Sequence, residues 1–159
     1  MKIEICQHKT YKNSYVAICT LPSAKRTIVV DGTPYRLQFP EMKFFIEVGC
    51  LNNKYHFQSL RVTDKTGHLL SLPHQANDGL VCLEDGYSYH ISRIDIKELC
   101  EEVVNYFWQS EFLYHFNDCN FGSFQFRKDL EEGSISALDR KSWIASLVHL
   151  ENYKLVRKC

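Results

Sequence analysis

One short segment of the chain places a thiol, an imidazole and an amide within nine residues. From Leu72 to Leu83 the sequence reads LPHQANDGLVCL, with His74, Asn77 and Cys82 as its chemistry-bearing side chains. Pro73 favours extended backbone before it, and Asp-Gly is typical of a tight turn. We therefore expect Cys82 to follow a turn near an edge of a sheet, where an exposed thiol could meet a large partner.

The same residues also have ordinary structural interpretations. Cys82 lies between Val81 and Leu83 and could be a buried strand thiol, because free cysteines often behave as small hydrophobic residues. His74 follows a proline and could be a loop histidine on the surface. Asn77 and its neighbours could form a turn and nothing more.

The segment resembles the active-site segment of ubiquitin-conjugating enzymes, in which a His-Pro-Asn element precedes Gly-x-Ile/Val-Cys-Leu. It is more similar to the prokaryotic ubiquitin-conjugating-enzyme-like family D, bacterial and phage proteins that include PRTRC system protein B. That family has a downstream Phe-Trp-x-Ser-x-Phe helix, matched here by Phe107–Phe112. A weaker similarity to a strand turn of conjugating enzymes lies at Asp31–Tyr35.

The resemblance implies a thioester carrier. Cys82 would receive the C-terminal acyl group of a ubiquitin-like modifier protein from an activating enzyme, and a lysine amine would then attack the thioester. His74 stands where the family has asparagine, so His74 or Asn77 would be the donor that stabilises the oxyanion. An unperturbed thiol with a pKa of about 8.5 supplies enough thiolate for this exchange. No cofactor or metal is implied.

Three other functions remain open. The chain could be a non-catalytic protein-interaction module on the same fold, which the change to His74 favours. It could be a thiol hydrolase in which Cys82 pairs with His90 or His74, although local signatures of cysteine proteases are absent. It could also be a phage or plasmid accessory protein with a structural or inhibitory role.

The elements that would position this segment change character along the chain. Short runs rich in β-branched and aromatic residues, separated by turn residues, predict six strands in the first half. These expected strands are Lys2–Cys6, Ser14–Thr20, Thr27–Val30, Tyr35–Phe39, Lys43–Val48 and Tyr55–Val62. Sequential strands with short turns predict an antiparallel meander.

Helical spacing begins near residue 96. Apolar residues recur at three- and four-residue steps and predict a helix from Ile96 to His115, capped by Ser92 or Asp95. Its inner face would hold Ile96, Leu99, Cys100, Val103 and Phe107. A second helix is expected from about Asp139 to Asn152, with Trp143, Leu147 and Leu150 on its inner face.

These elements predict an α+β fold in which an antiparallel meander is followed by helices packed on one face, as in the ubiquitin-conjugating fold. One domain would span residues 1–159, strand-rich over 1–83 and helix-rich over 92–155.

Composition narrows the function classes. The 159 residues carry 19 basic and 19 acidic side chains, so no strong field favours nucleic acid or an acidic membrane. No apolar run approaches the ~20 residues of a membrane span, and the first residues lack a signal-peptide pattern. Seven cysteines without zinc-site spacing indicate a reduced, cytoplasmic setting. The oligomeric state is left open.

Overall fold

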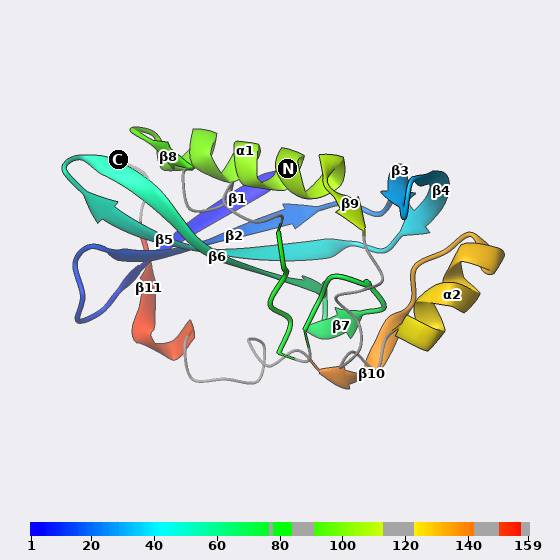
Figure 1. Cartoon of the computed structure of the whole chain (residues 1–159). Coiled ribbons are helices and arrows are strands. Elements are labelled where there is room, and N and C mark those ends of the chain that lie inside the picture. Colours follow the sequence, from blue (N-terminus) through cyan, green and yellow to red (C-terminus); the bar gives the residue numbers. More distant parts are fainter. Residues whose placement is uncertain (77, 84–90, 113–122, 142–149, 157–159) are drawn as a thin grey trace.

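The computed structural model describes residues 1–76, 78–83, 91–112, 123–141 and 150–156. Its main element is an antiparallel six-stranded sheet (Figure 1). The strands of this sheet are β1 (Lys2–His8), β2 (Ser14–Leu21), β5 (Met42–Leu51), β6 (Lys54–Asp64), β8 (Ser92–Arg93) and β11 (Tyr153–Leu155). They lie side by side in the order β11-β1-β2-β5-β6-β8, so β11 and β8 form the two edges.

Two smaller sheets complete the β structure. The hairpin of β3 (Ala24–Val30) and β4 (Thr33–Phe39) leaves the main sheet, and β9 (Glu111–Phe112) pairs with β3 in parallel. The second small sheet pairs β7 (His68–Leu70) with β10 (Ala137–Lys141).

The six predicted strands are confirmed, each somewhat longer than expected. Two tight turns explain why their spacing could be read from the sequence. Asp31 and Gly32 have φ of 46° and 81° between β3 and β4, and Asn52 and Asn53 have φ of 52° and 60° between β5 and β6. Two-residue turns with positive φ at both positions match the twist of antiparallel strands and favour Asp, Asn and Gly.

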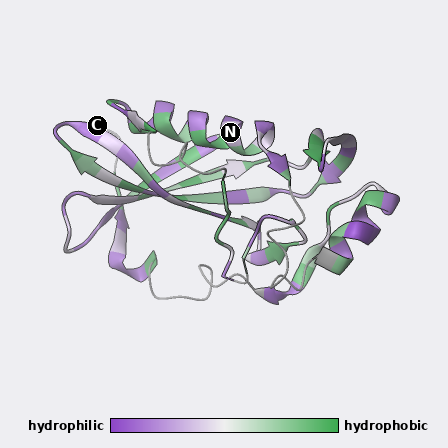
Figure 2. Cartoon of the chain, viewed as in Figure 1, coloured by the Kyte–Doolittle hydropathy of each residue, from purple (hydrophilic) through white to green (hydrophobic). Residues whose placement is uncertain are grey.

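The helix α1 (Ile96–Gln109) covers one face of the main sheet (Figure 1). Its expected inner face is buried. The Phe107 ring packs edge-on against Phe44 of β5, with the ring centroids 5.0 Å apart. Asp95 is the N-cap, and its carboxylate accepts a hydrogen bond from the Lys97 amide at 2.8 Å. In Figure 2 the hydrophobic side of α1 faces the sheet. No helix within the described residues is long and apolar enough to cross a membrane.

The helix α1 ends earlier than the sequence predicted. Ser110 adopts extended backbone with φ −68° and ψ 150°, and the chain continues into β9. His115, the expected end of the helix, lies outside the described residues. Parallel pairing of Glu111 and Phe112 with Val29 and Val30 satisfies the backbone there. A contact so distant in sequence leaves no trace in local periodicity.

The predicted α+β fold, a meander with helices packed on one face as in ubiquitin-conjugating enzymes, is wrong. Among the described residues, strands make up 53% and helices 20%, and only two α-helices occur. The β3–β4 hairpin interrupts the meander, so β2 pairs with β5. The half predicted as helical also contributes β8 and β11 to the edges of the main sheet.

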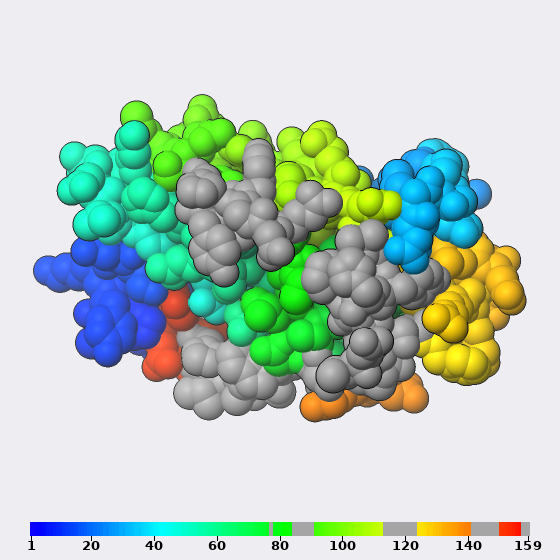
Figure 3. Space-filling model, viewed as in Figure 1, coloured from blue at the N-terminus to red at the C-terminus, as the bar shows by residue number. Residues whose placement is uncertain are grey.

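The predicted second helix is also wrong at its start. Ala137–Lys141 form β10, because their backbone pairs with β7, and Leu150 lies in a 3₁₀ turn (Leu150–Asn152). Trp143 and Leu147 lie outside the described residues. The second helix within the described residues is α2 (Ser123–Glu132), beside the β3–β4 hairpin at one end of the molecule (Figures 1 and 3).

Candidate functional site

The Leu72–Leu83 segment lies along the part of β6 that β8 leaves unpaired. The Val81 amide donates to the Leu60 carbonyl at 2.8 Å, and the Val62 amide donates to the Gly79 carbonyl at 3.3 Å. Its surface is part of the face shown in Figure 3. The expected placement of Cys82 after a turn at a sheet edge is therefore confirmed.

Cys82 is exposed, and its main chain is held from within the segment. Its amide donates to the His74 carbonyl at 2.9 Å. Gly79 has φ of 84°, a left-handed conformation that favours glycine, and Asp78 accepts from the Leu80 amide at 3.0 Å. These contacts fix the backbone on both sides of the turn.

The electrostatics at Cys82 oppose thiolate formation. Partial burial raises the pKa of the Cys82 thiol, and the nearby Asp78 carboxylate raises it further. A raised pKa leaves less thiolate at neutral pH than a free cysteine would have. Burial and the Asp78 carboxylate therefore both act against the thiolate that hydrolysis needs.

The His74 ring lies in the core rather than at the surface. It is 2% exposed and stacks on Phe107, with the ring centroids 5.3 Å apart. Its centroid lies 4.0 Å from that of Phe112. Neither ring nitrogen has a hydrogen-bond partner among the described residues. Burial lowers the pKa of His74 to about 3, so the ring is neutral at physiological pH. It would have to turn outward to donate a hydrogen bond to an oxyanion at Cys82.

The structure brings together only part of the predicted site. His74 and Cys82 meet through the main chain, while Asn77 and His90 lie outside the described residues. Within the described ranges, no group of three or more His, Cys, Asp or Glu side chains could hold a metal ion. The thioester and hydrolase hypotheses therefore stay predictions, and the exposed thiol of Cys82 is the one described feature that supports them.

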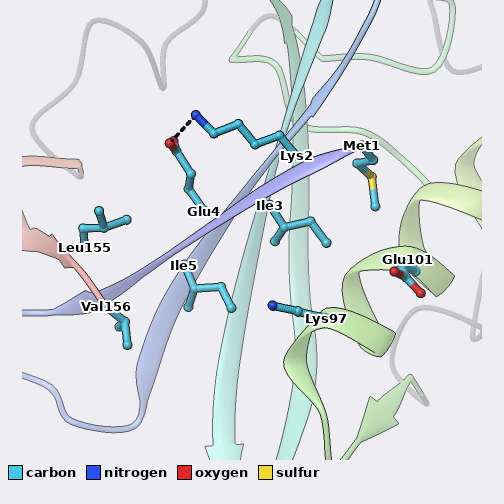
Figure 4. Close-up of a pocket in the computed structure, with 9 residues that line it drawn as sticks. All are labelled: Met1, Lys2, Ile3, Glu4, Ile5, Lys97, Glu101, Leu155 and Val156. Atoms are coloured by element: carbon cyan, nitrogen blue, oxygen red, sulfur yellow. Dashed lines mark ion pairs between the residues drawn. The ribbon is translucent and has the colours of Figure 1, made fainter. Parts of the chain in front are cut away.

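A second surface feature escaped the sequence analysis. A groove of about 560 Å³ lies between β1, the end of β11 and the start of α1 (Figure 4). Five apolar residues line it together with four charged ones, Lys2 and Glu4 of β1 and Lys97 and Glu101 of α1. These apolar residues are Met1, Ile3, Ile5, Leu155 and Val156.

The groove lies beside an open stretch of strand. β11 pairs only with Cys6–His8, and the Val156 amide donates to the Ile5 carbonyl at 2.7 Å. Backbone groups of a strand alternate in direction, so the N–H and C=O of Ile3 point to the same side as those of Ile5. No strand in the described part of the chain pairs with Ile3 on that side.

The two faces of β1 differ in chemistry. Figure 4 shows Ile3 and Ile5 on the side that faces α1, and Lys2 and Glu4 on the other side. Lys2 Nζ and Glu4 Oε1 are 2.9 Å apart, and their side chains are 73% and 42% exposed. The alternation in Lys-Ile-Glu-Ile predicts such a strand, but only the structure shows which face of it borders the groove.

No family model, curated protein or solved structure matches the chain. The resemblance to prokaryotic ubiquitin-conjugating-enzyme-like family D therefore stays a prediction.

Proposed function

We propose that the protein is a non-catalytic protein-binding module and that the groove between β1 and α1 is its binding surface. The observation that carries the proposal is the clustering of exposed apolar side chains there. Met1 is 51% exposed, Leu155 59% and Val156 41%. Apolar side chains gathered at one groove are typical of interaction sites, whereas singly scattered ones are not.

The predicted catalytic segment supports a non-catalytic function. The thiol of Cys82 has a raised pKa, and the imidazole of His74 is buried and neutral. Neither property helps nucleophilic attack or oxyanion stabilisation. A binding surface needs only shape and exposed apolar area, and both occur at the groove.

The test uses tagged protein recovered from its native host in four forms. These forms are wild type, Cys82→Ser, Val156→Asp and Val29→Asp. Val29 is the matched control, because it is 38% exposed on β3 and does not line the groove. A co-purifying protein is identified by mass spectrometry, purified, and titrated against each form by calorimetry.

We expect Val156→Asp to weaken binding of that partner at least tenfold, since a buried carboxylate at a contact costs more than ~1.4 kcal/mol. Cys82→Ser and Val29→Asp should leave the affinity unchanged. Equal affinity of wild type and Val156→Asp would refute the proposal.

Thioester carriage is a second candidate function, and the exposure of Cys82 favours it. Its partners would be an activating enzyme and a ubiquitin-like modifier protein. Intact-mass analysis of wild type and Cys82→Ser, with and without reductant, tests it directly. A reductant-sensitive adduct of small-protein mass that requires Cys82 would support carriage, and its absence would leave the binding module.

The proposed module would work in a reducing, cytoplasmic compartment. Five cysteines fall within the described residues, and all five are free thiols. Free thiols persist where glutathione and thioredoxin keep them reduced. Oxidised intermolecular adducts in the native host would argue against this location.

A further inference from the structure

A second hollow adjoins the groove, beside the C-terminal half of α1. This hollow, the Arg26 pocket, has a volume of about 480 Å³ and is bounded by the end of β2, by β3 and by α1. Met1 and Glu101 line both the groove and the Arg26 pocket, so the two spaces are neighbours. Figure 4 shows these two side chains at the end of the groove farther from Leu155 and Val156.

Arg26 of β3 is held in place by an aromatic ring. Its guanidinium carbon lies 4.5 Å from the centroid of the Trp108 ring, which is a cation–π contact. The indole in turn packs edge-on against Phe39 and Phe107, with the ring centroids 4.9 Å apart in both pairs. A guanidinium that is already positioned loses little conformational freedom when it binds an anion.

Arg26 has no anionic partner among the described residues. No carboxylate of these residues forms an ion pair with it, whereas Arg61 pairs with Glu47 at 3.0 Å and with Asp78 at 3.7 Å. Burial lowers the pKa of Arg26, because the guanidinium loses hydration. An anion in the pocket would replace that hydration.

The hydrogen-bond donors of the stacked pair support the same conclusion. Arg26 Nε and Trp108 Nε1 are both buried, and neither has a hydrogen-bond partner in the described part of the chain. Buried donors cost stability unless an acceptor reaches them, so the pair favours a ligand that carries acceptor oxygens. Because Nε is buried, the terminal nitrogens of Arg26 are the ones that such a ligand would meet.

The remaining lining defines the class of ligand. Leu21, Pro22 and Val104 give the pocket an apolar wall, which suits a ligand with an apolar body. Glu101 at the shared border repels a second negative charge, so a dianion such as phosphate is disfavoured. A single carboxylate matches the planar guanidinium of Arg26 with two parallel hydrogen bonds.

We propose that the Arg26 pocket is a binding site for a small monocarboxylic acid with an apolar body. The carboxylate pairs with Arg26, and the apolar body lies against Leu21, Pro22 and Val104. This site goes beyond the proposed protein-binding function and does not depend on it, because its ligand is a small molecule and its charged anchor lies outside the groove.

Two probes of similar shape and different charge test the site. 4-Phenylbutyrate carries a carboxylate, and 4-phenylbutanamide is its neutral counterpart. Each is titrated at pH 7 into ¹⁵N-labelled protein, with the indole N–H of Trp108 as the NMR reporter. The chain has two tryptophans, so the variant Trp143→Phe assigns the Trp108 signal.

We expect wild type to bind 4-phenylbutyrate at least about tenfold more tightly than the amide, because only the acid forms a charged pair with Arg26. Arg26→Gln should remove this preference, and Arg26→Lys should restore only part of it, since lysine lacks the planar fork. Arg36→Gln is the matched control, because Arg36 is exposed on β4 and does not line the pocket. The dispersion of each spectrum shows whether the variant is folded.

Three results would overturn the site. The first is the absence of a saturable Trp108 shift with 4-phenylbutyrate, and the second is equal affinity for the acid and the amide. The third is an equal loss of both probes in Arg26→Gln, which would assign Arg26 to the packing of Trp108 alone. If neither probe binds while Arg26→Gln weakens the protein partner as Val156→Asp does, Arg26 belongs to the protein interface and the small-molecule site is wrong. The Val156→Asp result by itself bears on the groove alone.

Discussion

Two buried polar side chains of this protein have opposite surroundings. Asp129 of α2 is fully buried, and its carboxylate accepts hydrogen bonds from the Ser136 amide at 2.8 Å, the Ser136 hydroxyl at 2.7 Å and the Gln125 side-chain amide at 3.0 Å. The hydroxyl of Ser71 donates to it as well. His74 is equally buried, yet its ring lies between aromatic rings and has no hydrogen bond to any described residue.

The difference shows what each residue does for the fold. Asp129 links α2 to the segments beside β7 and β10, since its partners Ser71 and Ser136 follow and precede those strands. Four donors compensate the carboxylate for its lost hydration. His74 has no such compensation and persists as a neutral aromatic spacer. Burial therefore does not by itself identify a functional polar residue, and neither of the two side chains reaches a ligand-accessible surface.

At neutral pH the largest expected effect comes from removing the satisfied carboxylate. Asp129→Ala leaves the donors of Ser71, Ser136 and Gln125 without their acceptor, and we expect it to lower the free energy of unfolding by about 3 kcal/mol. Urea denaturation measures this loss. Glu131→Ala on the exposed side of α2 is the control and should change stability by less than ~0.5 kcal/mol. Similar effects of the two substitutions would remove the contrast between Asp129 and His74.

The second effect is a pH dependence that originates at His74. Its pKa is about 3 in the folded protein, against about 6.5 when unfolded, so the unfolded chain binds the extra proton between these values. Stability is therefore lost as the pH falls from about 6.5 towards 3, by up to ~1.4 kcal/mol per pH unit. His74→Phe should lack this component. The difference between the unfolding free energies of the two forms isolates it from the carboxylates, and a difference independent of pH would contradict the assignment.

At neutral pH the same substitution should have a smaller effect of opposite sign to that of Asp129→Ala. His74→Phe removes two unpaired ring nitrogens from an apolar site, and we expect the protein to be stabilised by about 1 kcal/mol. Thermal unfolding at pH 7.5 measures the change. A loss of stability instead would show that the imidazole has a partner or a shape that phenylalanine cannot replace.

The smallest effect concerns Cys82. Because burial and Asp78 raise the pKa of its thiol, Cys82 should react slowly with iodoacetamide at pH 7 and much faster above pH 9. Asp78→Asn should accelerate alkylation a few-fold at pH 8, because it removes the nearby negative charge. Peptide mapping by mass spectrometry follows Cys82 separately from the other thiols. Fast alkylation at pH 6 would instead indicate an activated nucleophile and revive the hydrolase hypothesis.

Local pattern was sufficient for the six predicted strands and for the start of α1. Alternating side chains, Asp-Gly and Asn-Asn turns and the Asp95 cap each act over a few residues, so they can be read from sequence. α2 could not be found in this way. Its buried positions include a carboxylate, Asp129, and Phe124 is 68% exposed, so the helix lacks the apolar stripe that reveals α1.

The candidate site shows the same difference between local features, which could be predicted, and long-range contacts, which could not. The turn before Cys82 is local and was predicted, but the burial of His74 depends on Phe107 and Phe112, which are more than 30 residues away in sequence. The groove depends on β11 returning to β1 across almost the whole chain. Neither long-range contact has a local signature, which explains why the sequence analysis singled out the thiol and missed the groove.

Hydrogen–deuterium exchange with and without the purified partner tests the central claim most directly, because it compares both regions in one experiment. The account predicts slower exchange in the complex at the Ile3 amide and in the first turn of α1, with no change from Gly79 to Leu83. Protection confined to Gly79–Leu83, with unchanged exchange at Ile3, would place the binding surface at Cys82 and contradict the assignment to the groove.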